Sequence, residues 1–164
     1  LLALYLIRDL RWTCLIAGEP QNDIQIKYLA ELRRMVGSLE LDGRVRFIGQ
    51  QKDVRRLLAA SDVLCQANEG PEGFSMTFLE ALSTGLPIVT TRLGGAPEAI
   101  DGTCGLLAPA FDDQEFASAL RRIILEPELR SALARGALER AAMFQPEVQL
   151  RRLNDALVHY FRGT

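Results

Sequence analysis

The sequence is poor in the residues that build metal centres and disulfide frameworks. It contains one histidine and three cysteines, Cys14, Cys65 and Cys104, among 164 residues. The cysteines are odd in number and widely spaced, so neither a zinc site nor a disulfide framework is expected. Cys14 and Cys65 lie inside apolar runs, where an inert thiol packed in the core is the usual role.

A surplus of charge of one sign is also missing. Nineteen lysines and arginines face 21 aspartates and glutamates, for a net charge of -2. A nucleic-acid-binding protein needs a basic surface to replace phosphate counterions, so no nucleic-acid partner is expected. The longest apolar run, residues 1–7, is far shorter than the ~18 residues that span a bilayer. It also lacks the basic leader and cleavage site of a signal peptide. We therefore expect this run to be neither a transmembrane segment nor a signal peptide.

What the chain does contain is an alternation of short apolar runs and longer amphipathic stretches. At 164 residues with 48% hydrophobic side chains it suits a single domain, residues 1–164. The alternation predicts βα units around a mostly parallel sheet. Strands are expected at residues 12–17, 45–48, 62–66, 87–91 and 105–108. The last part of the chain predicts a helical tail, with helices over 112–125, 127–143 and 146–161.

The loop after the third expected strand carries the most chemical information, because open α/β sheets bind ligands beyond the carboxyl ends of their strands. Residues 67–75 are rich in glycine and lead into a helix expected over 76–84. Backbone N–H groups at the start of that helix have no partner within it and favour an anion. These are the N–H groups of Phe74, Ser75, Met76 and Thr77.

Two carboxylates bracket this candidate anion site. Glu80 follows Met76 by four residues and shares its helix face, and a carboxylate accepts two hydrogen bonds from a vicinal diol such as ribose. Glu72 lies in the loop on the other side. The spacing predicts a phosphate between two sugar-binding carboxylates. The alternative is that Glu72 is a loop acid near a helix start and Glu80 a solvated helix residue.

The run Glu72-Gly73-Phe74-Ser75-Met76-Thr77-Phe78-Leu79-Glu80, followed by Gly85-Leu86-Pro87, resembles a known signature. It is the Glu-x7-Glu pattern of retaining glycosyltransferases with the GT-B fold, of the family-4 type (glycosyl transferases group 1). Further segments resemble that family in the same order along the chain: Leu15 to Gly18, Val45 to Gly49, Leu57 to Val63, Gly94-Gly95 with Pro97-Glu98, and Gly105-Leu106-Leu107. The resemblance covers nearly the whole chain.

The resemblance implies the C-terminal, donor-binding half of a GT-B enzyme, a Rossmann-like parallel sheet flanked by helices. Such an enzyme transfers a sugar from a nucleoside diphosphate to an acceptor hydroxyl with retention, and needs neither a metal nor another cofactor. Glu72 matches the acid at the transferred sugar and is the catalytic candidate. The resemblance assigns the donor to a larger set: Glu80 at the ribose, Gly73, Phe74, Ser75, Met76 and Thr77 at the diphosphate and sugar, and Gly18, Gly49, Gln50 and Gln51 toward the base.

Two departures from the family pattern limit these expectations. Ser75 stands where many relatives have glycine. The family's first strand, with a basic clamp for the diphosphate, and its acceptor domain would precede Leu1. We therefore expect this chain alone to be inactive. A sugar or glycolipid acceptor would bind the missing domain of a cytoplasmic enzyme of polysaccharide biosynthesis, and any inner-membrane contact would be made there too.

Other functions remain open. One is a non-catalytic nucleotide-sugar-binding module of the same fold, and another is a sugar-nucleotide epimerase of the GT-B fold. A dehydrogenase is disfavoured, because Gly18-Glu19-Pro20 lacks the Gly-x-Gly-x-x-Gly pattern that approaches a dinucleotide.

Overall fold

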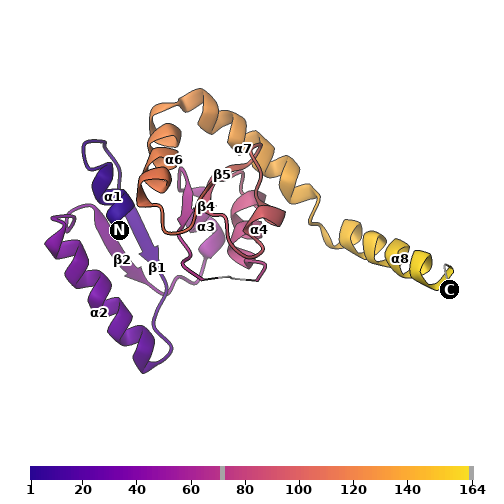
Figure 1. Cartoon of the computed structure of the whole chain (residues 1–164), viewed down its shortest axis with the longest axis horizontal. Coiled ribbons are helices and arrows are strands. Elements are labelled where there is room, and N and C mark those ends of the chain that lie inside the picture. Colours follow the sequence, from indigo (N-terminus) through magenta and orange to yellow (C-terminus); the bar gives the residue numbers. More distant parts are fainter. Residues whose placement is uncertain (71–72, 163–164) are drawn as a thin grey trace.

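The computed structural model describes residues 1–70 and 73–162, which form an α/β body with a helix extending from it (Figure 1). The helices are α1 (Leu2–Leu6), α2 (Asp23–Ser38), α3 (Val54–Ala59), α4 (Met76–Ser83), α5 (Ala96–Ala99), α6 (Asp113–Leu125), α7 (Pro127–Ala142) and α8 (Pro146–Arg162). The strands are β1 (Cys14–Ala17), β2 (Val45–Gly49), β3 (Leu64–Gln66), β4 (Ile88–Thr91) and β5 (Gly105–Ala108). The α/β fold class and the helical tail are thereby confirmed.

The strands form two parallel sheets, where the sequence predicted one. β1 pairs with β2, and β4 lies between β3 and β5. Within the described residues no backbone ladder joins β1 to β3. Side chains meet there instead: the thiols of Cys14 and Cys65 share a hydrogen bond, which raises the pKa of Cys14. Both cysteines pack against the apolar clusters, as predicted, but they are only half-buried and lie at the edge of the core.

β4 is the central strand of the larger sheet and separates two apolar layers. Successive side chains of a strand point to opposite faces. Ile88 accordingly packs in the cluster formed with α4, α5 and α7, whereas Val89 packs in the cluster formed with α1 and α6. All four residues of β4 are buried, because helices cover both faces of this sheet.

The smaller sheet and α2 form a second, more open layer. Only Val36 of α2 is buried, and it packs with Leu41 and Val45. α1 connects this layer to the body through α6. The Arg121 guanidinium lies 2.7 Å from the Asp9 carboxylate and holds the pKa of that carboxyl below its ordinary value.

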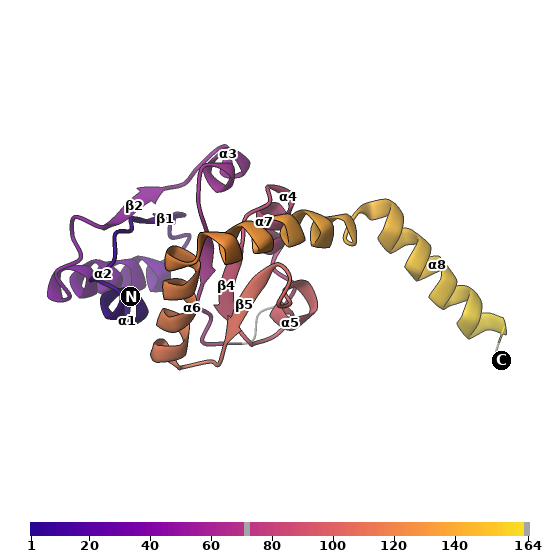
Figure 2. The same cartoon turned by 90° about the horizontal axis from the view of Figure 1, so that it is seen from above.

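α7 and α8 follow each other but relate differently to the body. α7 lies across α4 and buries Leu133, Gly136 and Ala137. α8 points away from the body, and residues 149–161 are all exposed (Figure 2). The structure confirms the predicted helices here but shows that only one of the two is packed.

Candidate functional site

The N-terminus of α4 has no side-chain cap, a feature that it shares with α1, α5 and α7, whereas α2, α3 and α6 are capped. Asn22, Asp53 and Asp112 each accept a hydrogen bond of 2.9 Å from the backbone of their own helices, α2, α3 and α6. Ser75 occupies the corresponding place before α4, yet its hydroxyl makes no cap bond. Since the first N–H groups of a helix have no partner within it, those of α4 keep their capacity to bind an anion.

Ser75 is only 6% exposed and has φ -74° and ψ 119°. This is ordinary extended backbone that any residue adopts, so the position does not require a glycine. The serine adds a hydroxyl at the start of α4.

Glu80 lies on the solvent side of α4. Phe78, Ala81 and Leu82 are buried against the sheet, which turns Met76 and Glu80 outward. Met76 is 66% exposed and Glu80 is also exposed. An exposed carboxylate therefore stands one turn above the start of the helix, as expected both for a ligand-binding residue and for a solvated one. Glu72, the other expected carboxylate, lies outside the described residues.

Two buried threonine hydroxyls fix the chain where it leaves β3. Thr90 donates to the carbonyl of Gln66 at 2.8 Å. Thr91 accepts from the N–H of Asn68 at 3.0 Å and donates to the carbonyl of the same residue at 2.9 Å. The sequence analysis missed both threonines, although two adjacent hydroxyl residues at the end of a buried strand were a signal for them.

Gly95 contacts the loop between β3 and α4 at its second end, just before α4. A Cβ atom at Gly95 would lie 2.9 Å from the Gly73 carbonyl oxygen and 3.2 Å from Cα of Phe74. Only glycine lets the two backbones come this close. The Gly94-Gly95 turn and the Glu72-to-Glu80 segment, separate motifs in the sequence, are therefore in direct contact.

A polar hollow of about 350 Å³ lies at the carboxyl end of β3. It is lined by Gln66, Ala67, Asn68, Glu69 and Gly70, together with Tyr28 of α2. Tyr28 was not among the expected site residues, because helical periodicity does not reveal which distant loop a helix faces. The hollow shows that α2 and the loop after β3 border the same space.

The expected base-binding residues gather at the ends of β1 and β2. The Gly18 N–H donates to the Gly49 carbonyl at 2.9 Å, so the two glycines lie together. The side-chain amide of Gln51 donates to the Ile48 carbonyl at 2.6 Å, and Gln50 is exposed. The structure thus brings the ends of β1 and β2 and the segment after β2 to one place.

The part of the chain that the structure describes, residues 1–70 and 73–162, holds no group of three or more histidine, cysteine, aspartate or glutamate side chains placed to bind a metal ion. None of its helices combines the length and the apolar character needed to cross a bilayer.

Comparison with known proteins agrees with this geometry. The family model "Glycosyl transferases group 1" matches residues 1–126. The chain is 36% identical over 155 residues to D-inositol 3-phosphate glycosyltransferase of Saccharomonospora viridis, a match that covers 93% of this chain and 35% of that protein. It is 35% identical to N-acetyl-alpha-D-glucosaminyl L-malate synthase of Bacillus anthracis over 65% of this chain and 28% of that protein. The chain thus spans about a third of the length of the curated relatives it matches.

Solved structures show the same arrangement of elements. Alr3699/HepE of Anabaena in complex with UDP superposes with a TM-score of 0.86 at 26% identity, covering 96% of this chain and 44% of that one. The C-terminal domain of the group 1 glycosyl transferase LpcC of Francisella tularensis superposes with a TM-score of 0.77 at 26% identity, covering 87% and 75%. The signature segment of this chain, its fold and the family match over residues 1–126 agree with one another. Together they show that this chain belongs to the glycosyl transferases group 1 family.

Proposed function

We propose that this domain binds a nucleoside-diphosphate sugar at the start of α4 and is the donor half of a glycosyltransferase. The full enzyme would transfer the sugar to an acceptor hydroxyl with retention of configuration. The observation that carries the proposal is the uncapped N-terminus of α4 with the exposed carboxylate of Glu80 one turn above it. This pairs a site for an anion with a site for a diol, the two groups that a nucleotide sugar presents together.

The diphosphate is assigned to the backbone N–H groups of Ser75, Met76 and Thr77. These groups stand at the positive end of the α4 dipole, and the Ser75 hydroxyl adds a donor that the helix does not use as a cap. When the glycosidic bond breaks, negative charge grows on the leaving diphosphate, and preorganised donors stabilise that charge. The proposed role of the α4 start is therefore both binding and leaving-group stabilisation, without a metal.

The remaining parts of the donor are assigned to neighbouring residues. The Glu80 carboxylate would accept hydrogen bonds from the two ribose hydroxyls. Gly18 and residues 49–51, which lie together at the ends of β1 and β2, would face the base. Glu72 and Gly73 would contact the transferred sugar, an assignment that rests on the family signature.

The nucleotide is proposed to be uridine diphosphate. Alr3699/HepE, at 26–27% identity, is known in complexes with UDP, with UDP and glucose, and with UDP-glucose. The acceptor is proposed to be a sugar or glycolipid hydroxyl bound by residues outside this chain, which by itself would not catalyse transfer. We place the reaction in the cytoplasm, because three free cysteines fit a reducing compartment.

Ligand-observed NMR tests the proposal, because it detects millimolar binding. The chain is titrated with UDP, GDP, ADP and their glucose conjugates, beside Glu80→Ala. UDP ligands are expected to bind, and the variant to bind them about 10- to 100-fold more weakly, corresponding to the ~1.5 to 3 kcal/mol of hydrogen bonds to a charged acceptor.

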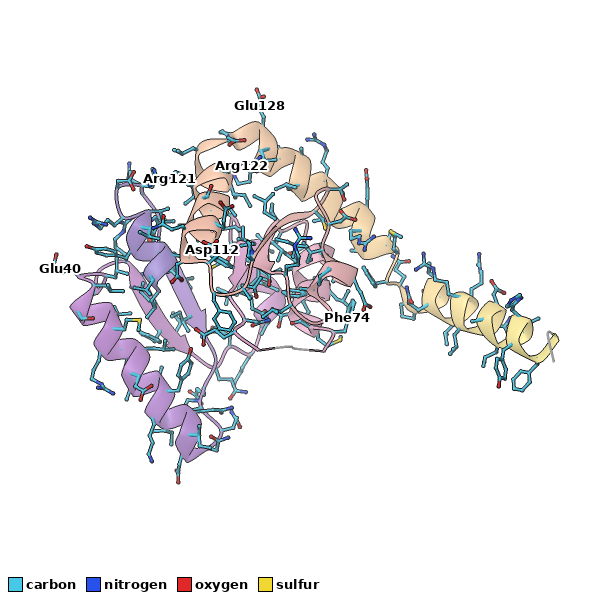
Figure 3. The ribbon with its side chains drawn as sticks, viewed as in Figure 1. Glu40, Phe74, Asp112, Arg121, Arg122 and Glu128 are labelled. Atoms are coloured by element: carbon cyan, nitrogen blue, oxygen red, sulfur yellow. The ribbon has the colours of Figure 1, made fainter. Side chains whose placement is uncertain are left out.

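Glu128→Ala is the matched control. It removes the same charge from the far end of α7, away from Phe74 and the start of α4 (Figure 3). The Glu128→Ala variant should bind UDP as tightly as the unaltered chain. Equal affinities of Glu80→Ala and the control would remove Glu80 from the ribose site, and binding of none of the nucleotides would overturn the donor-domain proposal.

A further inference from the structure

The donor loop, defined here as residues 73–75, has an aromatic contact far away in the sequence. The Phe74 ring is 40% exposed and lies 5.3 Å, centroid to centroid, from the ring of Phe144, with an interplanar angle of 52°. Phe144 belongs to the short connection between α7 and α8. Figure 3 shows Phe74 on the side of the body from which α8 departs.

Phe144 is in turn supported by the body. It is half-buried and packs against the apolar cluster of α4, α5 and α7. The guanidinium of Arg140 lies 5.4 Å from its ring centroid, within the range of a cation–π contact. The ring therefore sits between the donor loop on one side and a packed layer on the other.

Arg140 joins this aromatic pair to α5. Its side chain is 19% exposed and donates to the carbonyls of Glu98 at 2.6 Å and Ala99 at 3.1 Å. These are the carbonyls that the end of a helix leaves without partners. A rigid fork of five donors lets one arginine hold the end of α5 and also face Phe144.

α5 in turn contacts the donor loop, because Gly95 at its start packs against the backbone of Gly73 and Phe74. The donor loop is thus held by its backbone at Gly95 and by its side chain at Phe144. Arg140 contacts both supports, one through α5 and the other through the ring. None of Arg140, Phe144 or this pairing belongs to the signature segment.

We propose that Phe144 is a positioning residue for the nucleotide sugar, with Arg140 as its support. This inference rests on the proposed function of the α4 start. Phe74 directly precedes the N–H groups assigned to the diphosphate, so fixing its ring fixes those donors before the ligand arrives. Such preorganisation lowers the cost of binding and leaves the number of contacts with the ligand unchanged.

The test compares Phe144→Ala and Phe144→Tyr, which keeps the ring. UDP affinity, the amide ¹H–¹⁵N shifts of residues 73–77 and the melting temperature are measured for each. Phe144→Ala should bind UDP about two- to tenfold more weakly, the range expected for one aromatic pair. It should also change the amide chemical shifts of residues 73–77 in the ligand-free protein. Phe144→Tyr should keep both the UDP affinity and the chemical shifts of the unaltered chain.

Leu133→Ala serves as the control for lost stability, since this α7 residue is buried in the cluster formed with α1 and α6, whereas Phe144 packs against the cluster of α4, α5 and α7. A merely structural role for Phe144 would make the two alanine variants equal in affinity at equal melting temperature, and that result would overturn the inference. Unchanged amide shifts in Phe144→Ala would overturn it as well. Failure of the proposed function looks different: the unaltered chain binds no nucleotide, whatever the Phe144 variants do.

Discussion

The two consecutive helices α7 and α8 are similar in length and both begin with proline, yet they differ in how they pack. In α8, Leu150, Leu153, Leu157 and Tyr160 recur at spacings of three and four residues, the pattern of an apolar helix face. These side chains are 48–67% exposed. α7 has no comparable apolar stripe but buries Leu133, Gly136 and Ala137. An apolar pattern shows which face can pack, not whether this domain covers it.

A close approach explains why α7 packs. A Cβ atom at Gly136 would overlap the carbonyl oxygen of Thr103, so only glycine allows the helix to lie against the turn before β5. Arg140, one turn later, joins the same helix to Asp101 at 3.4 Å. This close approach and this ion pair therefore add to the buried side chains that hold α7 in place. Three changes compare α7 with the exposed α8.

The largest effect is expected from Gly136→Ala. The added methyl group collides with backbone that cannot move aside easily, so the free energy of unfolding should fall by about 3 kcal/mol or more. Urea unfolding followed by circular dichroism measures it. Gly102→Ala, which has open space around its Cβ position, is the control and should cost less than about 0.5 kcal/mol. Equal losses in the two variants would contradict the close-approach explanation.

A smaller effect is expected from acid. Hydrogen bonds from the hydroxyl and the N–H of Thr103, and then the charge of Arg140, hold the pKa of Asp101 below its ordinary 3.8. A carboxyl whose pKa is lowered by folding adds stability above pH 3.8, and that stability is lost as the pH falls through the folded-state pKa.

The contribution should be about 1 kcal/mol or less, because the side chain is 43% exposed and solvent screens it. Unfolding free energies at pH 6 and pH 3, measured beside Asp101→Asn, isolate it. The variant should be less stable at pH 6 and should lose less stability on acidification. Parallel pH profiles would show that Asp101 does not stabilise the turn under α7.

The smallest effect is expected from Leu153→Ser combined with Leu157→Ser in α8. Both side chains are already exposed, at 57% and 48%, so the unfolding free energy of this chain should change by less than about 0.5 kcal/mol. Leu133→Ala in α7, where the side chain is buried, should cost about 2 to 5 kcal/mol in the same assay. A loss above about 1 kcal/mol in the α8 variant would mean that its apolar face is covered.

Local signals predicted most of the elements and the exposed face of α4. The strand over 105–108 and the start of α4 at Met76 agree with the sequence analysis, because apolar runs, glycines and caps act over a few residues. The exposed position of Glu80 follows from the same helical period. The division into two sheets was not predicted, because the strand pattern does not reveal which edges pair.

The amino-acid sequence by itself determined the order of helices and strands, the family signature and the residues to consider at the α4 start. Only the tertiary structure decided what supports them: Gly95 against Gly73, and Arg140 and Phe144 behind Phe74. The reason is separation along the chain. Arg140 binds a carbonyl 42 residues away, and Phe144 lies farther still from Phe74. No local periodicity records such contacts, which form only when the packed layers bring distant segments together.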